Sequence, residues 1–167
     1  EHHPKSVPTL LSLAKLYRTQ GKYAAAESLL QRALTVQAKT LSPDHPDIAA
    51  TLNSVALLRA EQGRYAEAQS AYLRALKIRE KALGLDHDLV AETLHNLALL
   101  FMTVSQEDQA EPLLRRALAI REKVLGPEHP LVGQSLEHLA TVYGDRLKDA
   151  EAEPLYWRAL AVVEKAH

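Results

Sequence analysis

The residues from 45 to 84 read HPDIAATLNSVALLRAEQGRYAEAQSAYLRALKIREKALG. Apolar and small residues recur in this stretch at steps of three and four, first between Ile48 and Val55 and again from about Ala66 to Leu83. That spacing is typical of one face of an α-helix. Gly63 and Gly84 follow the two segments, where a helix end commonly needs a residue with positive φ. The stretch therefore predicts two α-helices joined by a short turn.

The same pattern recurs every 42 residues along a chain of 167 residues. Histidine stands at 3, 45, 87 and 129, and alanine stands eleven positions after each of them. Four such units fill the chain, and we divide it into repeats 3–44, 45–86, 87–128 and 129–167 of a single domain, residues 1–167. A lone helix pair cannot bury its apolar face, whereas stacked neighbours bury a continuous core. The repeat therefore predicts an all-α fold of four antiparallel helix pairs.

The composition of the chain excludes several classes of protein. Twenty Lys and Arg face 21 Asp and Glu, and this balance argues against nucleic-acid binding and against charge-driven membrane binding. The longest apolar run, Leu97 to Val104 with Thr103 counted, is far too short for a helix that spans a membrane. The chain has no cysteine, which excludes disulfides and thiolate zinc sites. With no signal peptide visible, we expect a cytoplasmic protein, and because residue 1 is Glu1 we expect a piece of a longer parent.

Several segments carry a resemblance to a known family. They are Leu-x-x-Leu-Ala early in three of the units and Leu-x-x-Val-Ala in the second, Gln-Gly-Arg-Tyr at 62–65, Arg-Ala-Leu-Lys-Ile-Arg-Glu-Lys at 74–81 and Gly-Pro-Glu-His-Pro at 126–130. The chain resembles a tetratricopeptide repeat (TPR) protein, and its 42-residue spacing resembles the kinesin-light-chain class of these repeats. The resemblance implies a right-handed α-solenoid that acts as a scaffold for protein binding, with no catalysis and no cofactor.

Two of the four expected turns depart from the family pattern. Ser105 and Leu147 stand where Gly21 and Gly63 occupy the turn between the two helices of a repeat. Side chains other than glycine rarely adopt the left-handed conformation that this turn needs. We therefore predict that the turns of repeats 3 and 4 deviate from those of repeats 1 and 2.

The family register places one face of each first helix on a concave groove. We expect the groove to be lined by Lys15, Arg18, Asn53, Leu57, Glu92, His95, Asn96, Leu99, Met102, Glu137, His138 and Thr141. The same register places Pro8, Leu11 and Ala50 there. Side-chain amides can hydrogen-bond a peptide backbone, and leucine or methionine can receive an apolar side chain. These residues predict a groove for an extended peptide; the alternative is a merely solvated face.

Other chemistries find little support. The clamp by which some family members capture the carboxylates of heat-shock proteins would retain only Asn96, and Glu92 would repel a carboxylate. We expect the four junction histidines to begin the first helices about 10 Å apart, too far to share a metal. One Glu-x-x-His pair, Glu92 and His95, falls short of a di-iron set. No phosphate-binding loop or nucleophile motif occurs, so we expect no metal site and no enzyme.

The C-terminal end suggests a second interface. Trp157 occupies a position held by Gln31, Leu73 and Arg115 in the other repeats. We expect an apolar patch formed by Trp157, Val162 and Val163. Either further repeats follow in the parent, or this end self-associates, or Trp157 folds back on its own helix pair. The predicted function is binding of a protein or peptide in the groove; the alternative is an assembly module that joins further repeats or a second copy.

Overall fold

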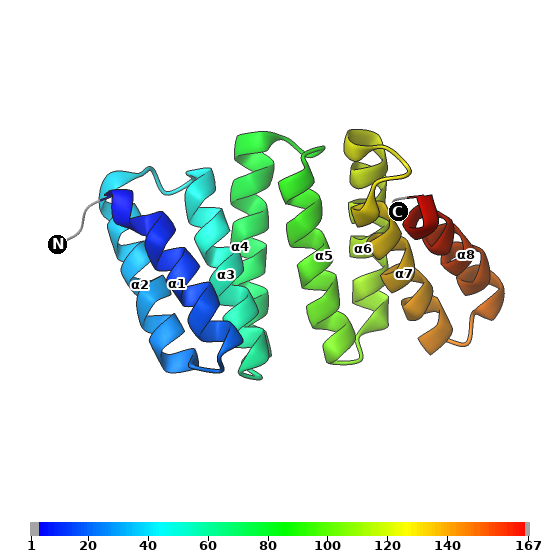
Figure 1. The fold of residues 1–167 in the computed structure, drawn as a ribbon, viewed down its shortest axis with the longest axis horizontal. Helices are drawn as coiled ribbons and strands as arrows, with labels where there is room; N and C mark the ends of the chain where they lie inside the picture. The colour runs from blue at the N-terminus through cyan, green and yellow to red at the C-terminus, as the bar shows by residue number, and fades with distance from the viewer. Residues whose placement is uncertain (1–3, 166–167) are drawn as a thin grey trace. The chain divides into compact units, whose positions relative to one another are not determined.

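The computed structural model describes residues 4–165, and over that range the protein is all-α (Figure 1). A short 3-10 helix, Pro4–Ser6, precedes eight α-helices. They are α1 (Val7–Thr19), α2 (Tyr23–Thr40), α3 (Pro46–Glu61), α4 (Tyr65–Leu83), α5 (Asp88–Thr103), α6 (Glu107–Leu125), α7 (Pro130–Asp145) and α8 (Asp149–Lys165). Both helices predicted from residues 45–84 are confirmed, and the second begins one residue before the predicted Ala66 and ends at the predicted Leu83.

The chain divides into two compact units, Glu1–Ala82 and Leu83–His167. In the first unit, apolar residues of α3 and α4 form a buried cluster against which side chains of the preceding helix pair also pack. The cluster consists of Ile48, Ala49, Leu52, Ala75 and Ile78, with Leu34 and Leu41 packed against it. In the second unit, the helix pairs α5–α6 and α7–α8 are each closely packed, and α6 also contacts α7. No helix in the described range is long and apolar enough to cross a membrane.

The junction histidines begin the first helices, as predicted. His45, His87 and His129 are the N-caps of α3, α5 and α7, and the Nδ1 atom of each accepts a hydrogen bond from the backbone N–H two residues later, at 3.2 Å in all three cases. Each histidine thus satisfies one of the helix-terminal N–H groups that lack an intrahelical partner. His3 lies outside the described residues.

The prediction that the turns of repeats 3 and 4 deviate is wrong. Gly21 and Gly63 have φ values of 71° and 74°, and Ser105 and Leu147 adopt the same left-handed conformation with φ values of 55° and 56°. In the turn of repeat 4 the Lys148 N–H donates to Tyr143 O at 2.9 Å, and the other three turns contain the same bond at equivalent positions. The packing of the helix pair and these hydrogen bonds fix the turn, and the non-glycine residues accept the strained backbone.

Buried polar side chains join consecutive repeats within each unit. In the first unit, Gln37 of α2 donates through Nε2 to the carbonyl of Asp47 at 2.9 Å, in the first turn of α3. In the second unit, the equivalent residue is Arg121 of α6, which donates through Nη1 to the carbonyl of Leu131 at 3.2 Å, in the first turn of α7. Both side chains are buried. These bonds fix the position of α2 against α3 in unit 1 and of α6 against α7 in unit 2.

Candidate functional site

The first-helix face of unit 1 contains a pocket. It has a volume of about 450 Å³ and lies among the N-terminal halves of α1 and α3 and the C-terminal end of α2. Its lining residues are Lys5, Val7, Pro8, Leu11, Gln37, Thr40, Leu41, Asp47 and Ala50. Three of them, Pro8, Leu11 and Ala50, are positions that the repeat register places in the groove. The pocket is therefore walled mainly by apolar side chains and has charged groups among its lining.

Gln37 contributes a hydrogen-bond acceptor that is not in use. Its Nε2 is occupied by the Asp47 carbonyl, while its Oε1 is buried without a hydrogen-bond partner. A buried amide oxygen without a donor is costly, and because this oxygen has almost no accessible surface a ligand in the pocket cannot reach it. The pocket therefore offers a ligand mainly its apolar walls.

The remaining predicted groove residues of unit 1 differ in accessibility. Lys15 is exposed and Leu57 is half-buried. Arg18 of α1 forms an ion pair with Glu61 of α3, so its charge is already partnered within the protein. Asn53 is only 5% exposed, and its Oδ1 has no hydrogen-bond partner. Asn53 therefore lies beneath the surface instead of on it.

In unit 2, two predicted groove residues meet at the contact between α5 and α7. The rings of His95 and His138 pack edge to face, with centroids 4.9 Å apart and planes at 77°. Nδ1 of His138 lies 2.9 Å from the carbonyl of Gln134, so that nitrogen must carry the proton. Nδ1 of His95 lies 3.3 Å from Nη1 of Arg121, which can only donate, so His95 is an acceptor there and is neutral.

The environment of His95 explains its titration. His95 is 6% exposed, and burial, together with the positive charge of Arg121 and the neighbouring His138, lowers its pKa to about 3. Arg121 also donates to Ser135 Oγ at 2.7 Å, which completes a buried network across three helices. Burial lowers the pKa of Arg121 as well, although the charges of Asp88 and Glu92 act in the opposite direction. The network holds α5, α6 and α7 together and does not offer His95 to a ligand.

The surface of this face consists of the other predicted residues. Glu137 is exposed, and the half-buried members are Glu92, Asn96, Leu99, Met102, His138 and Thr141. The Thr141 hydroxyl lies 3.1 Å from the hydroxyl of Tyr156, which links α7 to α8. Among the described residues, no group of three or more His, Asp or Glu side chains is placed to hold a metal ion. The face presents amide, thioether, carboxylate and apolar groups.

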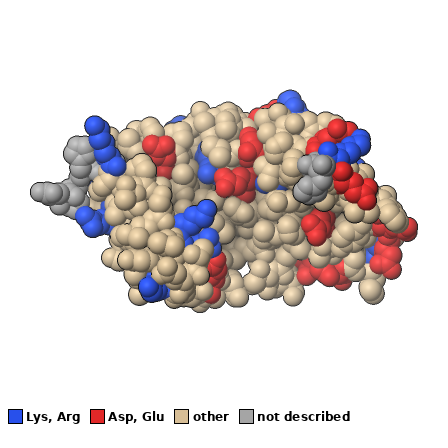
Figure 2. Space-filling model, in the orientation of Figure 1, with Lys and Arg blue, Asp and Glu red and all other residues tan. Residues whose placement is uncertain are grey.

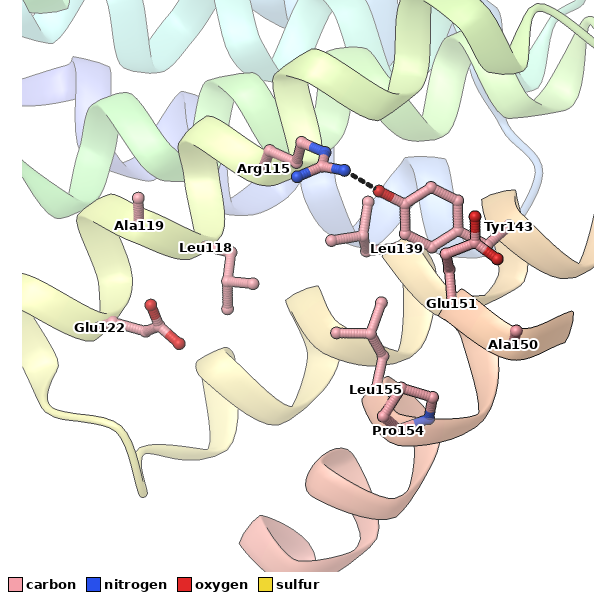
Figure 3. A pocket seen from close by; sticks show the side chains of 10 residues that line it. All are labelled: Arg115, Leu118, Ala119, Glu122, Leu139, Tyr143, Ala150, Glu151, Pro154 and Leu155. Atoms are coloured by element: carbon pink, nitrogen blue, oxygen red, sulfur yellow. Dashed lines mark hydrogen bonds between the residues drawn. The ribbon is translucent and has the colours of Figure 1, made fainter. Parts of the chain in front are cut away.

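A second pocket, which the sequence analysis missed, lies on the side of the second helices in unit 2 (Figure 3). It has a volume of about 540 Å³ between α6, α7 and α8. Arg115 donates to the Tyr143 hydroxyl there, and that hydroxyl donates to Glu111 at 3.0 Å. Burial and the bond to Glu111 raise the pKa of Tyr143. In the sequence, Arg115 and Tyr143 lie in adjacent repeats. That spacing does not predict their contact, because the contact depends on how α6 and α7 pack.

The comparison with known families decides the assignment. The family model of the tetratricopeptide repeat matches residues 6–81, 47–123 and 89–165. The chain belongs to the TPR family. Arrays of TPR units generally act as non-catalytic scaffolds for protein–protein interaction and use extended concave surfaces for it. No curated protein matches this TPR chain.

Solved TPR structures resemble the chain over nearly its whole length. BtubC (BKLC) from P. vanneervenii has a TM-score of 0.88 and 26% identity over 98% of this chain, which spans 65% of BtubC. A putative kinesin light chain with nearly identical TPR-like repeats, from Podosopora anserina, has a TM-score of 0.81 and 30% identity over 99% of this chain and 78% of its own. These matches confirm the predicted α-solenoid fold class and the likeness to kinesin-light-chain repeats.

A more distant match shows the fold alone. Aspartyl phosphate phosphatase F from Bacillus subtilis has a TM-score of 0.88 at 17% identity, over 98% of this chain and 41% of its own. Its helix pairs are arranged like those of this TPR chain although few residues are shared. The fold therefore tolerates very different surface residues, and function has to be argued from the surface.

The exposed apolar residues at the C-terminal end of this TPR chain differ in part from the expected patch. Val162 is buried in the α7–α8 pair, where its side chain packs against Gly133. Trp157 is exposed, and its Nε1 donates to Glu153 Oε1 at 3.3 Å on its own helix. Val163 is exposed, as are Tyr156 and Leu160, which the sequence analysis did not include.

Proposed function

We propose that this TPR chain is a non-catalytic module that binds an extended peptide segment of a partner protein along the faces of its first helices. The observation that carries the proposal is the pocket of about 450 Å³ in unit 1, because the predicted groove positions Pro8, Leu11 and Ala50 line it. An apolar side chain of the peptide enters this pocket.

Charge near the pocket selects the flanking residues of the peptide. Lys5 lines the pocket and Lys15 is exposed one helical turn beyond Leu11. Both are cationic, and opposite charge on a ligand raises its association rate and specificity. Asp47 lines the pocket too, so the preferred ligand has an apolar anchor with acidic residues placed toward the two lysines and away from Asp47. Unit 2 by itself presents amide and apolar groups of the same kind at Asn96, Leu99 and Met102.

The test is selection of peptides from a random display library, followed by measurement of their affinity by fluorescence anisotropy. Ala50→Trp fills the pocket from an exposed position on α3, so we expect at least a tenfold loss of affinity, roughly 1.4 kcal/mol. The matched control is Ala24→Trp, the same change at an exposed position of α2 outside the pocket. Circular dichroism checks that both variants fold.

Two results would contradict the proposal. One is that the library yields no peptide that binds the wild type. The other is that selected peptides bind Ala50→Trp as tightly as Ala24→Trp, which would move the binding surface elsewhere, for example to the second-helix pocket of unit 2.

A further inference from the structure

The last helix of the chain, α8, exposes a face that the second helix of the preceding repeat, α6, buries. Tyr156, Leu160 and Val163 of α8 lie on one stripe and are 44%, 45% and 50% exposed. The residues at the same repeat positions in α6 are Leu114, Leu118 and Arg121, and all three are buried. Since α6 contacts α7, this stripe is the surface on which a second helix receives the first helix of the following repeat.

The first helix of the chain exposes the complementary face. Thr9 and Leu16 of α1 are exposed, and Leu16 is 49% exposed. At the same repeat positions α7 has Ser135 and Val142, which are both fully buried. Ser135 is the residue that Arg121 of the preceding helix pair contacts, so these positions face the preceding repeat. Hence α1 exposes the half of the stacking interface that α8 lacks.

We propose that α8 of one copy of this chain docks on α1 and α2 of a second copy, head to tail, in the register that joins consecutive repeats. Unlike a two-fold contact between two α8 helices, this heterologous joint buries both exposed faces at once. Val163 stands at the repeat position of Gln37 and Arg121, whose side chains hydrogen-bond the first helix of the following repeat. Because valine cannot form this bond, the joint lacks it and is reversible.

The ion pairs within each unit predict the pairs across the joint. In unit 2, Arg158 of α8 pairs with Glu122 of α6 in the preceding repeat. Across the joint, the residue at the repeat position of Glu122 is Glu164 of one copy. The residue at the repeat position of Arg158 is Arg32 of the next copy. Neither of these two exposed residues has an ion-pair partner within the described range of the chain. The joint gives both a partner of opposite charge.

Two other contacts between consecutive repeats, an ion pair and a cation–π contact, also have counterparts at the joint. In unit 1, Arg64 pairs with Glu27 of the preceding repeat at 2.8 Å, and the corresponding residues at the joint are Lys22 and Glu153. In unit 2, Arg115 lies 5.6 Å from the ring centroid of Tyr143 in the following repeat. At the joint these two positions are held by Trp157 and Tyr17. An aromatic pair of this kind stabilises an interface beyond its buried area, and it accounts for the tryptophan at this position.

The net charges of the two units favour the same pairing. Unit 1 has 12 Lys and Arg and 7 Asp and Glu, a net charge of +5, whereas unit 2 has 8 and 14, a net charge of −6. On the visible face the basic side chains are more frequent over unit 1 and the acidic ones over unit 2 (Figure 2). Head-to-tail docking brings unit 2 of one copy against unit 1 of another, and such opposite charge speeds association.

Sedimentation equilibrium of the purified chain from about 1 μM to about 1 mM tests the proposal. The weight-average mass of the wild type should rise with concentration, and less so at high salt, which screens the charges. Arg32→Glu and Glu164→Arg should each weaken self-association about tenfold, because each replaces attraction by repulsion. The double variant should regain it. An equimolar mixture of the two single variants should regain it as well, because copies of the two variants alternate and every joint then pairs opposite charges at positions 164 and 32.

Two control variants test whether charge reversal away from the joint also weakens self-association. Arg74→Glu makes the same change as Arg32→Glu at the equivalent position of repeat 2, and Glu151→Arg changes an acidic residue of α8 that lines the second-helix pocket. Both should associate like the wild type. A wild-type mass that is constant up to about 1 mM would overturn the proposal and leave these faces to other repeats or partners. Self-association that Arg32→Glu does not weaken would also overturn it, in favour of a symmetric contact through α8.

Discussion

Leu147 should be a site where removing the side chain stabilises the protein. It has a φ of 56° in the turn between α7 and α8, and its side chain is 88% exposed. The left-handed conformation costs a non-glycine residue about 1.5 kcal/mol. At the equivalent Gly21 and Gly63, a Cβ atom would meet nothing within 4 Å, so the strain belongs to the backbone and not to a clash.

The expected gain for Leu147→Gly follows from three contributions. Relief of the left-handed strain stabilises by about 1.5 kcal/mol. The greater freedom of glycine in the unfolded chain costs roughly 0.7 kcal/mol. Loss of the small buried part of the leucine side chain costs roughly 0.3 kcal/mol. The free energy of unfolding should therefore rise by about 0.5 kcal/mol. Leu147→Asn should gain a similar amount, since asparagine tolerates the conformation without the entropy of glycine.

Urea unfolding followed by circular dichroism measures the change. With a slope of about 2 kcal/mol per M, the midpoint should rise by about 0.25 M without a change in slope. Gly63→Ala, which introduces the same strain into repeat 2, should lower the midpoint. Amide exchange of Lys148 N–H, which donates to Tyr143 O at 2.9 Å, reports on the turn itself. A lower midpoint for Leu147→Gly, together with faster exchange at Lys148, would refute the strain argument.

The remaining predictions concern the buried network and the helix starts. Because the pKa of His95 falls from 6.5 to about 3 on folding, its contribution to stability is complete above pH 6.5 and is lost as the pH falls toward 3. Between pH 7 and pH 4.5 the wild type should lose about 2.5 kcal/mol more than His95→Asn, as measured by urea midpoints, and equal losses would contradict this. Arg121→Gln should cost about 1–3 kcal/mol through its lost bonds to Ser135 and His95, whereas Arg121→Ala, which also removes the bond to Leu131 O, should cost more in the same assay. His129→Ala should cost about 1 kcal/mol by removing the cap on Leu131 N–H, and His129→Asp should restore it; thermal unfolding of both variants checks this.

The sequence alone was sufficient for the architecture of the chain. Helical spacing gave the helices, and the 42-residue period located every turn, since the α-helices begin at the same position of each repeat to within one residue from α3 to α8. The histidines at the repeat junctions could be assigned to helix starts because capping is a local interaction between a side chain and the next two residues. The family resemblance followed from the same local patterns.

Tertiary packing decided the conformation of two turns and the burial of several side chains, which the local patterns did not predict. The turns of repeats 3 and 4 follow the glycine turns because the paired helices impose a conformation that Ser105 and Leu147 do not prefer. The register placed Asn53 and His95 on the groove, but contacts between neighbouring helices bury them, and burial depends on distances that no single helix contains. The exposed stripe of α8 could be recognised only against its buried counterparts in α6. Local sequence thus determined the repeated helix pair, and the stacking of the pairs determined which of its faces remain available.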